Sequence, residues 1–117
     1  MQLVIRETRE VVASEVKEAY TFAKRLKGLM FTGRLPEWTA IHLAPCTSVH
    51  TFFMKYAIDV VHMDDQSMVT GVETGLKPGK LGKKFRGTHS IVELPAGTAA
   101  KTTLVPGQIL VFEKGEI

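Results

Sequence analysis

The sequence predicts a small α+β domain built mainly from antiparallel β-strands, with one amphipathic helix. Short runs rich in Val, Ile and Phe recur along the chain, and Gly, Pro, Asp or Ser bounds most of them, which is the pattern of strands separated by turns. Only the stretch that follows Thr21 changes to helical spacing. About eight short strands would bury their edges best in a partly closed barrel or sandwich, with the helix covering an open side.

Length and composition predict one globular domain that spans residues 1–117. A chain of this length buries roughly two-thirds of its unfolded surface in a single core. A content of 44% hydrophobic and 23% charged residues is the balance of an ordinary globular protein rather than of a disordered segment. The formal net charge of +3 is compatible with anionic partners but does not require them.

Three features predict the compartment. No apolar run approaches the roughly 18 residues of a membrane span, so we expect no contact with a membrane. The start, MQLVIRETRE, lacks the long apolar core of a signal peptide. The single cysteine, Cys46, cannot form an internal disulfide, which fits a reducing environment. We therefore expect a cytoplasmic protein.

Apolar patterning sets the predicted elements. Strands are expected at residues 2–6, 11–17, 39–43, 49–54, 58–63, 68–74, 90–94 and 109–113. The helix is expected to begin after Thr21, whose hydroxyl suits an N-cap, and to stop at Gly28. Its apolar stripe follows helical spacing through Phe22, Leu26, Leu29 and Met30. Residues 96–101 predict one further helical turn.

The stretch from Val49 to Asp65, VHTFFMKYAIDVVHMDD, is the part of the chain densest in β-branched, aromatic and sulfur-containing residues. Period-two alternation in a strand over residues 49–54 places His50, Phe52 and Met54 on one face. An imidazole inside such an apolar strand indicates a functional site.

The next strand, residues 58–63, carries Asp59 on a face that is otherwise apolar. A carboxylate there needs a hydrogen-bonding or cationic partner to offset desolvation. Residues 64–67 have turn chemistry, so the strand over residues 68–74 is expected to return as a hairpin partner. Gly71 inside it predicts a bulge or a close backbone approach.

A basic loop, residues 76–87, separates this hairpin from the later strands. Its cations are Lys77, Lys80, Lys83, Lys84 and Arg86. Clustered cations favour phosphate or nucleic acid, but Phe85 alone could stack on bases. A solvated, flexible loop is the plainer interpretation, and nucleic-acid binding is kept as an alternative.

Four blocks in the order RLKGLMF, APCTSVHTFFM, IDVVHMD and ELPAGTA resemble the prokaryotic family known as domain of unknown function 192. The resemblance covers roughly Val11 to Phe112. It implies a compact, β-rich single domain and no established activity. The family's recurring positions map onto Arg25, Gly28, Leu29, Met30, His50, Met54, Asp59, Asp64, Glu93, Leu94, Ala96, Gly97 and Thr98. Some members look exported with a leader, which we do not expect here, and some differ from this chain in the basic loop.

Cys46, His50 and Met54 are spaced four apart, with His42 four before Cys46. Thiolate, imidazole and thioether are the ligands of copper sites. Pro45 interrupts any strand that would join His42 to Cys46, and the paired cysteines of structural zinc sites are absent. A thiol and an imidazole four residues apart on a strand are separated by about 13 Å, too far for a nucleophile and its base. We therefore favour core roles for the two sulfur-bearing residues.

Our leading hypothesis is a binding module whose pocket is lined by His50, Met54 and Asp59, with Arg25 and Glu93 beside them. It would recognise a small polar ligand or a partner protein. Polar residues inside strands that otherwise have a core pattern motivate this hypothesis. The alternatives are an enzyme that uses His50 and Asp59 as acid and base, and a metal-binding protein.

Overall fold

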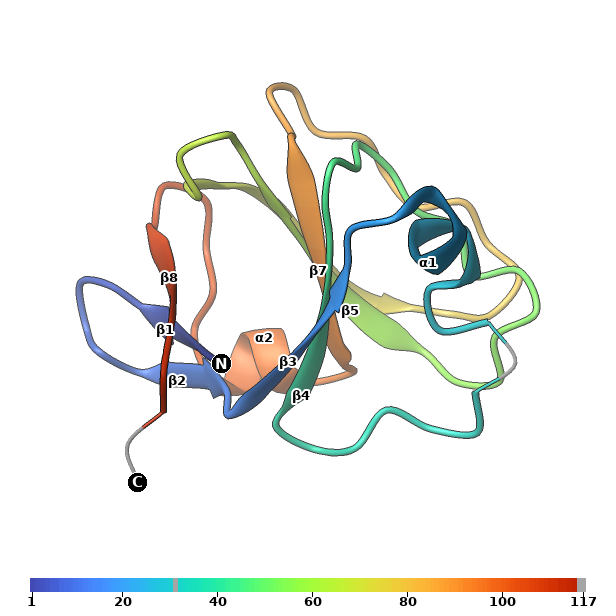
Figure 1. Cartoon of the computed structure of the whole chain (residues 1–117), viewed down its shortest axis with the longest axis horizontal. Helices are drawn as coiled ribbons and strands as arrows, with labels where there is room; N and C mark the ends of the chain where they lie inside the picture. The colour runs from blue at the N-terminus through green and yellow to red at the C-terminus, as the bar shows by residue number, and fades with distance from the viewer. Residues whose placement is uncertain (31, 116–117) are drawn as a thin grey trace.

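The computed structural model describes residues 1–30 and 32–115, and its elements form two sheets and two short helices (Figure 1). Phe31, the last residue of the block RLKGLMF, lies outside the described residues. The elements are β1 (Gln2–Ile5), β2 (Val11–Ala13), β3 (Glu15–Ala19), α1 (Phe22–Lys27), β4 (Thr39–Leu43), β5 (Ile58–Met63), β6 (Val69–Leu76), β7 (Ser90–Pro95), α2 (Thr98–Lys101) and β8 (Leu110–Glu113).

The strands are arranged in a three-stranded sheet of order β2-β1-β8 and a five-stranded sheet of order β3-β4-β7-β5-β6. All strand pairs are antiparallel except β3 with β4, which run parallel. The small sheet and α1 lie on opposite sides of the molecule in Figure 1. These features confirm a mostly β, α+β fold, and the sheets do not close into a barrel.

The five-stranded sheet is covered on both faces because two apolar clusters pack against it. One cluster joins the two sheets, since Leu3 and Leu110 of the small sheet pack with Val61 and Met63 of β5. The other cluster lies on the opposite face and includes Ile58 and Val60 of β5, together with Leu29, Leu43, Met54 and Ile91. Alternate residues of β5 therefore face different clusters, as the period of a strand requires.

The predicted strand over residues 49–54 is wrong. This segment is irregular, with one isolated bridge between His50 and Leu81 and a positive φ of 65° at Phe53. Its backbone groups bond to the basic loop instead: Thr51 N donates to Lys80 O at 2.8 Å, and Gly82 N donates to Val49 O at 2.9 Å. The basic side chains of the loop are exposed while its backbone is held by these bonds.

The predicted strand over residues 11–17 is two strands that belong to different sheets. The chain bends at Ser14, where the N–H groups of Ser14 and Glu15 both donate to the carbonyl of Trp38, at 2.8 and 3.2 Å. Two successive donors directed at one acceptor cannot belong to a regular ladder, because alternate groups of a strand point to opposite edges.

The predicted helix boundaries are confirmed, but the predicted apolar stripe is not. Thr21 Oγ1 accepts the Lys24 N–H at 3.2 Å, and the helix ends at Gly28. No residue of α1 is buried. Phe22 and Leu26 are 73% and 58% exposed. Leu29 and Met30 follow the helix instead of extending its face.

The predicted hairpin is confirmed, since β5 and β6 pair and Asp64 closes the turn by accepting the N–H groups of Gln66 and Met68. Gly71 marks the predicted close approach. A Cβ there would lie 2.1 Å from the Phe85 ring of the basic loop.

Within the described residues, the structure contains no helix that is long and apolar enough to cross a membrane.

Candidate functional site

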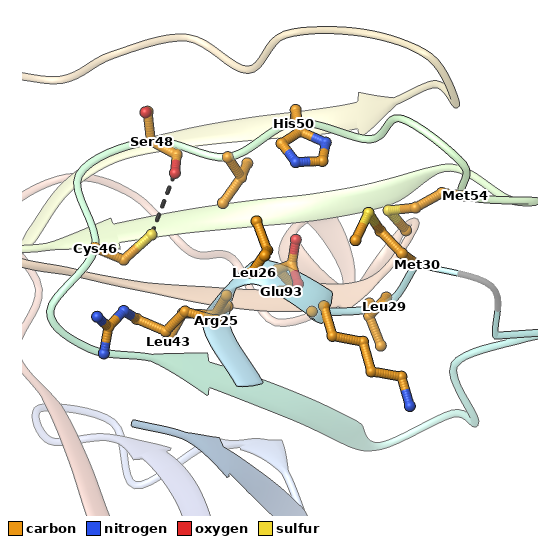
Figure 2. Close-up of a pocket in the computed structure, with 13 residues that line it drawn as sticks. Arg25, Leu26, Leu29, Met30, Leu43, Cys46, Ser48, His50, Met54 and Glu93 are labelled. Carbon is orange, nitrogen blue, oxygen red and sulfur yellow. Dashed lines mark hydrogen bonds between the residues drawn. The ribbon is translucent and has the colours of Figure 1, made fainter. Parts of the chain in front are cut away.

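A cavity of about 60 Å³ lies between α1, the segment that follows β4, and β7 (Figure 2). Three parts of the chain supply its walls: residues 25–30, residues 43–54 and one residue of β7. The lining residues are Arg25, Leu26, Lys27, Gly28, Leu29, Met30, Leu43, Cys46, Ser48, Val49, His50, Met54 and Glu93. Most of the wall is apolar or sulfur-bearing, and a few polar groups point inward, which is the usual make-up of a ligand pocket.

Glu93 is the most unusual group in this cavity. It sits in β7 between Ile41 of β4 and Val60 of β5, so its side chain emerges from the centre of the five-stranded sheet. It is only 3% exposed, and its Oε1 has no hydrogen-bond partner among the described residues. Burial raises the pKa of Glu93 to about 7. The carboxyl group is therefore divided between its neutral and ionised forms near neutral pH.

Gly28 shapes the wall opposite this carboxyl group. Its φ of 47° and ψ of −122° suit glycine alone, and a Cβ at this position would lie 3.5 Å from Glu93 Oε1. The turn at Gly28 directs Leu29 and Met30 into the cavity, as Figure 2 shows. Helical spacing in the sequence predicts that these two residues belong to the apolar stripe of the helix, so the sequence does not indicate that they line a cavity.

The aliphatic part of Arg25 lines the cavity, whereas its guanidinium group forms hydrogen bonds outside it. Its Nη1 donates to the carbonyl oxygens of Tyr20 at 2.9 Å and Ala44 at 3.4 Å. These bonds attach α1 to the end of β3 and to the segment after β4. Among the described residues Arg25 forms no ion pair with Glu93. It therefore positions the wall instead of neutralising the acid.

His50 points into the cavity from the segment after β4 (Figure 2). Its Nδ1 accepts the backbone N–H of Phe52 at 3.2 Å, and its ring stacks on the Phe52 ring with centroids 5.0 Å apart. Because Nδ1 is the acceptor, a neutral ring carries its proton on Nε2. The imidazole therefore offers the cavity an N–H donor.

Three sulfur atoms line the same cavity, from Met30, Cys46 and Met54. The thiol of Cys46 donates to Ser48 O at 3.2 Å, and burial raises the pKa of Cys46. A thiol in its neutral form is a poor nucleophile and a poor metal ligand. The His50 imidazole of the same cavity presents a proton rather than a lone pair. In the described part of the chain, no three His, Cys, Asp or Glu residues are arranged to hold a metal ion.

Asp59 does not line this cavity. It faces the opposite side of β5, and its carboxylate accepts the N–H groups of Gly75 at 2.9 Å, Gly97 at 3.0 Å and Ala99 at 2.9 Å. It is 0% exposed, so these bonds replace its solvation. Contrary to expectation, Asp59 and His50 do not share a pocket. The geometry therefore does not support an acid–base pair formed by these two residues.

Two other histidines, His42 and His62, are bonded through Nδ1, and the Nε2 of each is buried with no hydrogen-bond partner among the described residues. His42 bonds through Nδ1 to the Tyr20 hydroxyl at 2.7 Å and stacks on Phe112, and burial lowers its pKa to about 4. His62 bonds through Nδ1 to Thr88 Oγ1 at 3.2 Å and contacts the Phe85 ring. Neither histidine lines the cavity.

The comparison with protein families matches residues 3–112 to domain of unknown function 192, described as "Uncharacterized ACR, COG1430". The chain belongs to this family. It is 34% identical to a UPF0127 protein of Pyrococcus furiosus over 105 residues, which cover 86% of this chain and 88% of that protein. It is 32% identical to a UPF0127 protein of Pyrococcus horikoshii over 101 residues, which cover 81% and 85%.

A crystal structure of a protein of unknown function from Novosphingobium aromaticivorans has the same fold, with a TM-score of 0.81. The two chains are 19% identical, and the match covers 96% of this chain and 84% of the other.

Several of the positions to which the family resemblance points surround the cavity, although they are far apart in the sequence. They are Arg25, Gly28, Leu29, Met30, His50, Met54 and Glu93.

Proposed function

We propose that this protein is a small binding module that holds the polar tip of a small ligand in the cavity at Glu93. The observation that carries this proposal is the Glu93 carboxyl group, which lines a cavity and whose buried Oε1 has no partner among the described residues. A buried acceptor without a partner costs about 1–3 kcal/mol. A ligand that donates a hydrogen bond to the Glu93 carboxyl group offsets that cost, which the described residues do not.

The walls favour a ligand with an apolar body behind its polar tip. Leu29, Leu43 and Met54 are buried beside the carboxyl group, while Leu26 is half exposed where the cavity meets the surface. A ligand that entered past Leu26 would bury carbon against these side chains, which adds about 25 cal/mol for each Å² removed from water.

The test is a titration of the ¹⁵N-labelled protein with four three-carbon probes: propylamine, propionate, propanol and propionamide. We expect at least one probe to shift the backbone amide signals of Gly28, Leu29 and His50, with a dissociation constant on the order of millimolar for so small a molecule. The variant Glu93→Leu should lose these shifts and still fold, because it replaces an unpartnered polar group with an apolar one.

Glu15→Gln is the matched control, since Glu15 is an exposed carboxylate of β3 outside the cavity. It should bind the probes as the unaltered protein does. Absence of any shift at the cavity with all four probes, or equal binding by the Glu93→Leu variant, would remove the proposed function.

A further inference from the structure

We propose that the group this cavity recognises is a primary carboxamide. This inference rests on the proposed function and names the class of ligand for the same site. It follows from two polar groups that face the cavity, the carboxyl group of Glu93 as an acceptor and the imidazole of His50 as a donor.

The acceptor is the carboxyl group of Glu93, which lines the cavity from β7 and whose Oε1 is buried without a partner among the described residues. The donor is the Nε2–H of His50, which is fixed by the bond that Phe52 N makes to Nδ1. In Figure 2 the His50 ring and the Glu93 carboxyl group lie on opposite sides of the cavity and point toward each other. A ligand group between them must donate on one side and accept on the other.

A primary carboxamide has this arrangement, with an NH₂ donor and a carbonyl acceptor on one carbon atom. Its NH₂ would donate to the Glu93 carboxyl group, and its carbonyl would accept from His50 Nε2–H. When Glu93 is protonated, the same amide pairs with the neutral carboxyl group, since each group then donates once and accepts once. The ligand therefore fits both protonation states of the acid.

The charged groups match only one side of the cavity, and a hydroxyl group must donate and accept through a single oxygen atom. An ammonium group has three donors and no acceptor, so it leaves the His50 N–H without a partner. A carboxylate has no donor, so it faces Glu93 with repulsion whenever that group is ionised. A charged group also pays a larger desolvation cost than a neutral amide in an apolar pocket.

The cavity is large enough for the polar end of a ligand but not for a whole ligand. Its volume of about 60 Å³ accommodates about four water-sized spheres. The three non-hydrogen atoms of a carboxamide fit this space. The carbon chain behind them would then pass the apolar side chain of Leu26 toward the surface.

The experiment compares the affinities of the same three-carbon probes at neutral pH, and the backbone amide chemical shifts measure binding. Propionamide should bind at least about fivefold more tightly than propylamine or propionate, because it makes one additional hydrogen bond. N,N-dimethylpropionamide retains the carbonyl but has no N–H, and it should not bind. Two variants test the two contacts separately.

His50→Phe preserves an aromatic ring but removes the donor, so the affinity for propionamide should fall about tenfold. Glu93→Gln retains an acceptor oxygen and should still bind propionamide while it loses any affinity for propylamine. If propylamine or propionate binds as tightly as propionamide and depends on Glu93, the carboxamide assignment is wrong and the binding function stands. If no probe binds, both are wrong.

Discussion

At the scale of single residues, two buried acids of the same sheet have opposite surroundings. Asp59 accepts three backbone N–H bonds, two of them from the start of α2 and one from Gly75 of β6. Glu93 is as deeply buried, yet its Oε1 accepts none from the described residues. The first acid stabilises the fold, and we propose that the second binds a ligand.

Asp59→Asn should lower the free energy of unfolding by about 2–4 kcal/mol, because an amide NH₂ would face at least one of the N–H donors that the carboxylate now accepts. Urea denaturation followed by circular dichroism measures this. His50→Ala is the comparison, since His50 is only partly buried and its ring accepts a single hydrogen bond from the described residues, that of the Phe52 N–H. We expect that change to cost less than about 1 kcal/mol. A small loss at Asp59 would show that its three bonds are not structural.

Glu93 should make stability depend on pH. Its pKa rises from 4.5 to about 7 on folding because of burial. The folded protein therefore binds the proton more tightly than the unfolded chain does. The stabilisation is complete below about pH 4.5 and is lost as the pH rises through about 7, by about 3 kcal/mol in total.

Glu93→Gln removes this titration. The stability of the unaltered protein relative to that variant should fall by about 3 kcal/mol between roughly pH 4 and pH 8. Taking the difference also cancels the contribution of His42, whose lowered pKa acts in the opposite direction at acid pH. Denaturant titrations at several pH values measure this difference. A constant difference across the range would contradict the burial of a titrating carboxyl group.

At the scale of elements, α1 departs most from its sequence pattern. Its apolar side chains are exposed, and the residues that pack inward come after Gly28. The helix is therefore held by its N-cap and by the Arg25 bonds to backbone carbonyls instead of by a buried face. This arrangement leaves α1 as one wall of the cavity.

Leu26 and Leu29 offer a matched test of this arrangement, since they are the same residue type and are 58% and 6% exposed. Leu29→Ala should cost about 2–4 kcal/mol in the free energy of unfolding, because it leaves a cavity in the core. Leu26→Ala should cost less than about 1 kcal/mol. Thermal and urea unfolding of both variants measure this. Equal losses would mean that the helix buries the face that its spacing predicts.

The sequence predicted elements whose signals are local. Thr21 and Gly28 bound the helix through their own chemistry, and Asp64 closes the hairpin by bonding to the residues that follow it. The segment over residues 49–54 could not be predicted, because its backbone pairs with residues 79–82 of the basic loop and Phe53 takes a positive φ. Non-local pairing of this kind overrides β propensity.

The site was predictable in composition but not in geometry. The sequence singled out Arg25, His50, Met54, Asp59 and Glu93, and the structure brings four of them to one cavity. Asp59 is separated from them because it lies on the face of β5 that it shares with Val61 and Met63, and this face points away from the cavity. Strand pairing alone determines which face an acid occupies.

At the scale of the whole molecule, the core cluster of Leu3, Leu110, Val61 and Met63 joins the two sheets. The strands β1 and β8 come from the two ends of the chain, and they pair with each other within the small sheet. Neither sheet buries this cluster without the other. We therefore predict that the protein unfolds as one cooperative unit.

Trp38 fluorescence and far-ultraviolet circular dichroism should report the same urea midpoint. Leu110→Ala, in the small sheet, should lower both midpoints together and cost about 2–5 kcal/mol, since Leu110 is 2% exposed. Separate transitions for the two probes would mean that the sheets fold independently.

The pKa of the buried Glu93 carboxyl group tests the proposed site most directly, and ¹³C nuclear magnetic resonance measures it. In protein labelled at the glutamate side-chain carboxyl carbon, the Glu93 signal is identified by its loss in Glu93→Gln and is followed against pH. We predict a titration midpoint at about pH 7. A midpoint near the ordinary value of 4.5 would show a solvated or paired carboxylate and would contradict the proposed binding site.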